Sequence, residues 1–187
     1  MFAVVFAGLS HPLAAQHDMS KMSGLPPAAT LEKGLGHLHH PVSTKNAEAQ
    51  RFFDQALTLV YAFNPDQAIK SFTRAADLDP SLAMAYWGVA LALGPNINLD
   101  VDPDREKAAY NAVQQAKKAA GNASENERAY IEALSRRYSL ADQADLHQLA
   151  SDYSKAMGAL AARYPDDLDA SVLYAESMMD LRPWALW

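Results

Sequence analysis

From residue 46 onward, apolar residues recur at intervals of three and four along the chain. This spacing puts them on one face of a helix, and no segment combines strand-like alternation with the residue types that strands favour. Asn, Gly and Pro interrupt the pattern near residues 64–65, 79–80 and 94–95. The breaks predict helices over 46–63, 65–79 and 81–93, and the pattern resumes after residue 103 with further helices, the last three over 124–140, 142–164 and 167–181. We therefore expect an all-α protein of about seven helices with an irregular N-terminal segment.

Small and aromatic residues occupy regular positions within residues 46–93. An aromatic and then a small residue fall in the first helix, Ala and Phe alternate in the second, and Pro ends the unit, at Phe52, Ala56, Ala68, Phe72, Ala75 and Pro80. The pattern restarts after Pro80 with Tyr86, Trp87 and Ala90. Small residues let two helices cross closely while aromatic residues fill the space beside them. This spacing resembles the tetratricopeptide repeat (TPR), which has a period of about 34 residues.

The resemblance implies a right-handed superhelical solenoid of antiparallel helix pairs. In that family the concave face is formed by the first helix of each pair and binds peptides or partner proteins. The loop over residues 94–104 lengthens the second repeat, and such insertions often lie on the binding face. The wider stretch, with HLHHPVST before the first helix and GPNIN after the third, is also similar to exported bacterial TPR proteins without a settled role.

The two ends of the chain differ from the helical region. Residues 1–16 contain a short apolar run and a small-residue segment, which resemble a secretory signal peptide and indicate a periplasmic or secreted protein, whereas the alternative is an apolar N-terminus of a cytosolic protein. Residues 17–45 are expected to be a linker and a His-containing loop, followed by a TPR-like domain over 46–187. Because that domain ends in an apolar segment with Trp184 and Trp187 instead of a polar capping helix, we expect it to be truncated.

Composition excludes several classes of function. The formal net charge is −6, so the chain has no basic face of the kind that nucleic acids require. The absence of cysteine excludes disulfides, thiolate catalysis and cysteine-bound zinc. No apolar run reaches the ~20 residues of a spanning helix, so no stable membrane span is expected. We find no nucleophile motif and no glycine-rich phosphate loop.

The best candidates for chemistry are His37, His39 and His40. In an extended segment, His37 and His39 project to the same side and could bind one transition-metal ion, such as copper or zinc, with Glu32 or Glu48 as a third ligand. The alternative is a surface loop whose histidines make ordinary hydrogen bonds. A weaker copper candidate is the segment 17–22, with one His and two Met. The Asn- and Asp-rich loop over 96–104 lacks the Gly and Glu that a calcium loop requires.

Two hypotheses follow for function. The first is an exported, non-catalytic scaffold that binds a protein or peptide, with these candidate binding residues: Asn46, Gln50, Asp54, Tyr61, Trp87, Asn96 and Asn98. Family members that clamp a terminal carboxylate use basic residues on this face, and their absence here argues against carboxylate clamping. The second is a metal-binding protein or metalloenzyme that uses the His37, His39 and His40 cluster.

Overall fold

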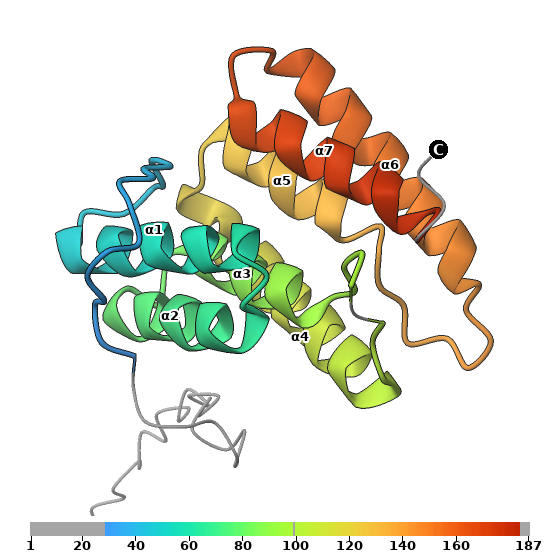
Figure 1. Ribbon diagram of the computed structural model, residues 1–187, viewed down its shortest axis with the longest axis horizontal. Helices are drawn as coiled ribbons and strands as arrows, with labels where there is room; N and C mark the ends of the chain where they lie inside the picture. Colours follow the sequence, from blue (N-terminus) through green and yellow to red (C-terminus); the bar gives the residue numbers. More distant parts are fainter. Residues whose placement is uncertain (1–28, 99, 184–187) are drawn as a thin grey trace, which may run out of the picture.

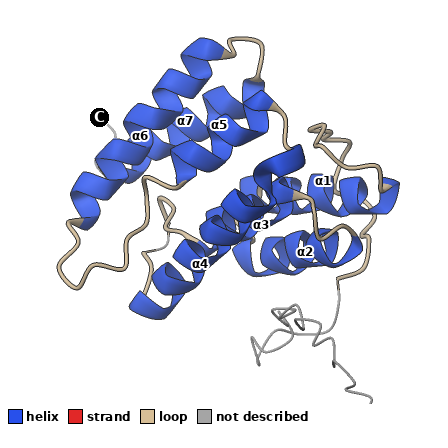
Figure 2. Cartoon of the chain, turned by 180° about the vertical axis from the view of Figure 1, so that it is seen from behind, coloured by secondary structure: helices blue, strands red, loops and turns tan. Residues whose placement is uncertain are grey.

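In the computed structural model, residues 29–98 and 100–183 are described. This part of the chain folds into seven α-helices and contains no β-strand, which confirms the all-α prediction. The helices are α1 (Ala47–Tyr61), α2 (Pro65–Leu78), α3 (Ala83–Leu93), α4 (Pro103–Ala119), α5 (Glu125–Leu134), α6 (Leu146–Arg163) and α7 (Leu168–Asp180), with a 3₁₀ turn over Ala120–Asn122. Figures 1 and 2 show α5, α6 and α7 as a group beside the group of α1 to α4.

Side-chain caps explain where most of these helices begin. Asn46, Asp102, Ser124, Asp145 and Asp167 each accept hydrogen bonds from backbone N–H groups of the first turn that would otherwise lack a partner. Ser124 and Glu127 form the expected capping box. The proline residues at the first positions of α2 and α4 cost no helical hydrogen bond. The sequence pattern therefore locates most helix starts, but the sixth helix begins at Leu146, four residues after the predicted position.

The core is centred on α3, in which ten of the eleven residues are buried. The repeat positions Ala68, Phe72 and Ala75 of α2 are fully buried. A Cβ atom added to Gly88 would lie 2.3 Å from the Phe72 ring, so glycine is required for the close approach of α2 and α3. Small residues thus serve here to let helices pack closely, as the repeat pattern predicts.

The fifth helix is shorter than predicted, because it ends at Leu134 instead of continuing to residue 140. The next residues form a turn from which two buried side chains reach other helices. The hydroxyl of Tyr138 donates to the Ala90 carbonyl over 2.8 Å. The guanidinium of Arg137 donates to the Pro95 carbonyl over 2.8 Å and to Asp180 over 2.5 Å. These tertiary contacts explain why the helix ends at Leu134, although the sequence pattern continues to residue 140.

The segment 29–45 has no regular secondary structure, but it packs along α1. Leu31, Leu35, Leu38 and Val42 contact the core, and the amide of Gln55 on α1 donates to the Thr30 carbonyl. The proposed signal peptide, the weaker copper candidate at 17–22 and the terminal tryptophans lie outside the described residues. No helix in the described ranges has the length and apolarity needed to cross a membrane.

Candidate functional site

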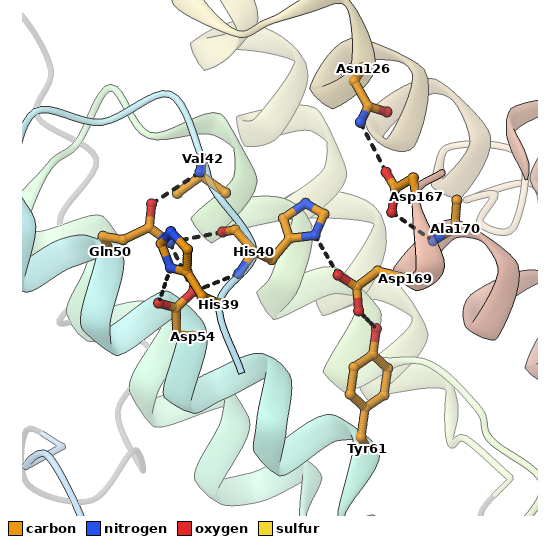
Figure 3. Close-up of polar contacts among 10 residues, drawn as sticks. All are labelled: His39, His40, Val42, Gln50, Asp54, Tyr61, Asn126, Asp167, Asp169 and Ala170. Carbon is orange, nitrogen blue, oxygen red and sulfur yellow. Dashed lines mark hydrogen bonds and ion pairs between the residues drawn. The ribbon is translucent and has the colours of Figure 1, made fainter. Parts of the chain in front are cut away.

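A chain of polar contacts joins the His-containing loop, α1 and α7 (Figure 3). The Nδ1 of His40 donates to Asp169 Oδ2 over 2.6 Å, and the hydroxyl of Tyr61 donates to Asp169 Oδ1 over 2.6 Å. Asp169 lies in the first turn of α7, whereas Tyr61 is the last residue of α1. The carboxylate of Asp169 therefore connects residues that are more than 100 positions apart in sequence.

This arrangement shifts the pKa of all three groups. Burial alone would lower the pKa of His40, but the hydrogen bond and charge of Asp169 outweigh it and raise the pKa. Burial would raise the pKa of Asp169, but hydrogen bonds from His40 and Tyr61 hold it below its ordinary value. The pKa of Tyr61 is raised by burial and by the adjacent carboxylate. At neutral pH, Asp169 is thus an ionised acceptor for two donors.

Asp167 lies next to this network. Its Oδ1 caps α7 by accepting the N–H of Ala170, and its Oδ2 accepts from the side chain of Asn126 over 3.0 Å. His40, Asp167 and Asp169 each offer one ligand atom, and these atoms all lie within 4.8 Å of one another. No other group of this kind occurs in the ranges 29–98 and 100–183. The three side chains could hold a metal ion.

His37 and His39 do not join this group, so the structure does not gather the three predicted histidines around one point. The side chain of His39 is exposed and its Nδ1 donates to Asp54 over 2.8 Å. His37 lines a separate shallow cavity beside Asp54 and Gln55. His40 is the member that turns inward, where its ring packs against Phe53 and Tyr130.

The side chains of three predicted partner-binding residues make hydrogen bonds within the chain. Asn46 caps α1, and its amide donates to the Leu78 carbonyl. The Gln50 amide donates to the His40 carbonyl and accepts from the Val42 N–H, and Asp54 accepts from His39 and from the backbone of His40. Because the loop occupies this face of α1, these polar groups are engaged within the chain. Their assignment to a partner surface stays a prediction.

Trp87, another predicted partner-binding residue, is buried. Only 3% of its surface is exposed, and its ring packs edge-on against Tyr130 at a centroid distance of 5.4 Å. Neither of the two cavities that adjoin Tyr61, Asn96 and Asn98 is lined by Trp87. It is a core residue, in keeping with its repeat position.

An apolar groove lies between α7 and the C-terminal ends of α1 and α3. Its volume is about 380 Å³, and it is lined mainly by Val60, Tyr61, Phe63, Leu91, Val172 and Met179. An engineered cavity of about 150 Å³ accepts one benzene molecule, so the groove has room for about two groups of that size. The groove includes Tyr61 and Asn96, which are candidate binding residues from the sequence.

Phe63 has an unusual backbone at the edge of this groove. Its φ is +53°, and it is the only non-glycine residue of the described chain with a positive φ. The N–H of Asn64 donates to the Leu59 carbonyl and the N–H of Phe63 to the Val60 carbonyl, which is a Schellman motif at the end of α1. This position usually carries glycine. Here it carries a phenylalanine that is 55% exposed and borders the groove.

A second, more polar cavity of about 570 Å³ adjoins the groove and shares Pro95, Asn96 and Ile97 with it. Its wall includes Asn98, Asp100, Glu106, Arg137, His147 and Asp180. We refer to it as the polar cavity. Arg137 is buried, pairs with Asp180 and stacks on Tyr153 at 4.8 Å from the ring centroid. Of its three acidic wall residues, Asp180 is paired with Arg137, so Asp100 and Glu106 are the acidic groups that could bind a cationic group.

Glu176 contributes a buried carboxyl group to the apolar groove. Its Oε2 is buried without a well-formed hydrogen bond in the described chain. Burial raises the pKa of Glu176 to about 8, although Arg137 opposes the shift. Glu176 is thus largely protonated at neutral pH and offers a neutral hydrogen-bonding group inside an apolar wall.

Sequence reasoning missed Asp167, Asp169, Phe63 and Glu176. The two aspartates look like ordinary helix-capping residues, and their position opposite His40 depends on the tertiary fold. Phe63 carried a local signal, because a helix that stops just before Asn-Pro commonly places a left-handed residue there. Comparison with protein-family models, curated proteins and solved structures gives no match for this chain.

Proposed function

We propose that this protein is a non-catalytic, exported helical-repeat scaffold of the TPR type that binds an extended peptide segment of another protein. The observation that carries the proposal is the apolar groove, which is lined by α1, α3 and α7. If helices are paired in chain order, these are first helices of their pairs. In a right-handed superhelical solenoid, the first helices would form the concave binding face.

The shape of the site favours an extended ligand. The segment Pro95–Ile97 lines both the apolar groove and the polar cavity. This segment belongs to the loop that lengthens the second repeat, where the family places binding residues. One compact small molecule would fill a single cavity, whereas an extended chain can place successive side chains in both.

The chemistry of the walls indicates which peptide would fit. The groove accepts about two apolar side chains. The polar cavity contains Asp100, Glu106 and Asp180, and Asp180 is already paired with Arg137. The chain as a whole carries a net charge of −6. We therefore propose a peptide in which two apolar residues are followed or preceded by Lys or Arg.

Selection from a library of displayed random linear peptides tests this function. The selected peptides should share an apolar pair with a neighbouring basic residue and bind the purified protein with micromolar affinity or better. Their affinity should fall at least tenfold for Val172→Asp, which puts a charge in the groove, and stay unchanged for Leu140→Asp. Leu140 has a similarly exposed side chain and lines neither cavity.

Two results would overturn the proposal. One is a selection that yields no peptide with a shared pattern. The other is a set of peptides that bind Val172→Asp as tightly as the unaltered protein, since these would occupy another surface. Circular dichroism on both variants shows whether the helical fold is retained.

A further inference from the structure

We propose that His40, Asp167 and Asp169 form a binding site for one divalent transition-metal ion. The site differs from the sequence-based candidate, because it uses only one of the three clustered histidines and takes its other two ligands from the start of α7. It is independent of the peptide-binding proposal, since neither aspartate lines the apolar groove or the polar cavity.

The ligand spacing suits one ion. Zinc lies about 2.0–2.2 Å from nitrogen and oxygen ligands, so two of its ligand atoms are at most about 4.4 Å apart. The three candidate ligand atoms lie within 4.8 Å of one another, so a pair at the upper end of this range must close by about 0.4 Å to reach the zinc limit. Nδ1 of His40 and Oδ2 of Asp169 are now 2.6 Å apart and share a proton. An ion would replace this proton and separate the two atoms to about 3.4 Å, which small side-chain rotations allow.

The charge and donor types select the kind of ion. Two carboxylates balance the charge of a divalent cation, and a neutral imidazole adds a nitrogen donor. This mixed nitrogen and oxygen set suits zinc, manganese or ferrous iron, whereas the lack of sulfur disfavours cuprous ion. Asp169 is oriented by the hydroxyl of Tyr61, and Asp167 by the amide of Asn126. Such outer hydrogen bonds are common around metal ligands.

Tyr130 provides a second observation. It is 1% exposed, and its buried hydroxyl lies close enough to Asp167 to raise the pKa of Tyr130, yet it makes no well-formed hydrogen bond in the described part of the chain. The Tyr130 ring lies edge-on to His40 at a centroid distance of 5.8 Å. Buried hydroxyls normally have a partner. A ligand or water bound to an ion at this cluster would supply one.

Access to the site is open. His40, Asp167 and Asp169 line a surface cavity of about 680 Å³ together with Pro41, Asn126 and Tyr164. Three protein ligands leave at least one coordination position free, as in catalytic zinc sites. An ion at this position could therefore take water or a further ligand from the cavity.

Zinc titration of the full-length protein without a histidine tag tests the site. Isothermal titration calorimetry should show one zinc ion per chain with a Kd in the micromolar range or below. Asp169→Asn and His40→Gln should each weaken binding at least tenfold. Asp166→Asn is the matched control, since Asp166 lines the same cavity but does not belong to the cluster, and should bind zinc as the unaltered protein does.

The result must be separated from loss of folding and from binding elsewhere. Circular dichroism should show all three variants folded, and Asp167→Asn replaces any variant that is not. Zinc should raise the melting temperature of the unaltered protein and of Asp166→Asn, but not of Asp169→Asn. The proposal is overturned if Asp169→Asn and Asp167→Asn bind zinc as tightly as the unaltered protein, or if only His17→Gln or His39→Gln abolishes binding.

Discussion

Replacing Phe63 by asparagine should weaken peptide binding without destabilising the fold. A phenylalanine with a φ of +53° is strained, because the left-handed conformation costs an L-residue about 1–2 kcal/mol. Asparagine adopts this conformation more easily and is found at the same position of helix ends. The strain is therefore a cost that the phenylalanine ring must offset.

The packing of the ring offsets only part of this cost. Full burial of a phenylalanine side chain contributes about 1.5–3 kcal/mol. Because Phe63 is 55% exposed, its ring contributes less than half of that, about 1 kcal/mol. The loss of packing and the relief of strain nearly cancel. We expect the free energy of unfolding of Phe63→Asn to change by between 0 and about +1 kcal/mol.

Leu140→Asn is the matched control for stability. Leu140 is 51% exposed and does not have a positive φ, so the substitution removes a similar amount of apolar contact and relieves no strain. It should cost about 1 kcal/mol. The two variants should differ by about 1–2 kcal/mol. Thermal unfolding followed by circular dichroism should therefore place Phe63→Asn about 2–8 °C above Leu140→Asn.

The binding measurement uses fluorescence anisotropy with a labelled peptide from the selection. Removal of an aromatic contact residue from an interface costs about 1–2 kcal/mol, which corresponds to a roughly 5- to 30-fold weaker Kd. Phe63→Asn should show this loss, and Leu140→Asn should not. The reasoning is refuted if Phe63→Asn is as unstable as Leu140→Asn, or if it binds the peptide with unchanged affinity.

Three further substitutions test other parts of the structure. Glu176→Gln should remove a pH dependence of stability. The folded-state pKa of Glu176 is about 8, above the ordinary value of 4.5, so the stability that its protonated form contributes is complete below pH 4.5 and is lost as the pH rises through 8. The loss is at most about 1.4 kcal/mol per pH unit. Urea denaturation should then give Glu176→Gln the same free energy of unfolding as the unaltered protein at pH 5 and a larger one at pH 8.5. If the free energies of the two proteins changed in parallel with pH, this would contradict the prediction. Gly88→Ala should destabilise the fold by about 1–3 kcal/mol, since its methyl group would overlap Phe72, and an unchanged urea midpoint would show that the helices can separate at no cost. Asn46→Ala should cost about 1 kcal/mol through the lost cap of α1, measured in the same way, whereas Asn46→Asp should retain most of it.

The helices were predictable because their signals are local. Asn46, Asp102 and Ser124 each cap the helix that follows them, and Pro65 and Pro103 mark the first helical positions. The end of the fifth helix was not predictable in this way. Arg137 and Tyr138 leave the helix to reach Asp180 and Ala90, and such partners are known only once the chain is folded.

The candidate site was predictable only in part, for the same reason. Tyr61 and Asn96 could be chosen from the sequence because the repeat pattern leaves them outside the core. His40 was distinguished from His37 and His39 only by the direction of its side chain, which depends on how the loop crosses α1. Asp169, its partner, lies 129 residues further along the chain. No local pattern links the two residues.

Tyr61 has a place in both candidate sites. Its ring lines the apolar groove, while its hydroxyl holds the carboxylate that would bind the metal ion. Any ligand that rotates this side chain changes the energy of Asp169, and an ion on Asp169 restricts the ring in return. Thermodynamic linkage requires the two effects to be equal in free energy. A single tyrosine would thus couple the two occupancies, so that peptide affinity depends on metal concentration and metal affinity on peptide concentration to the same degree.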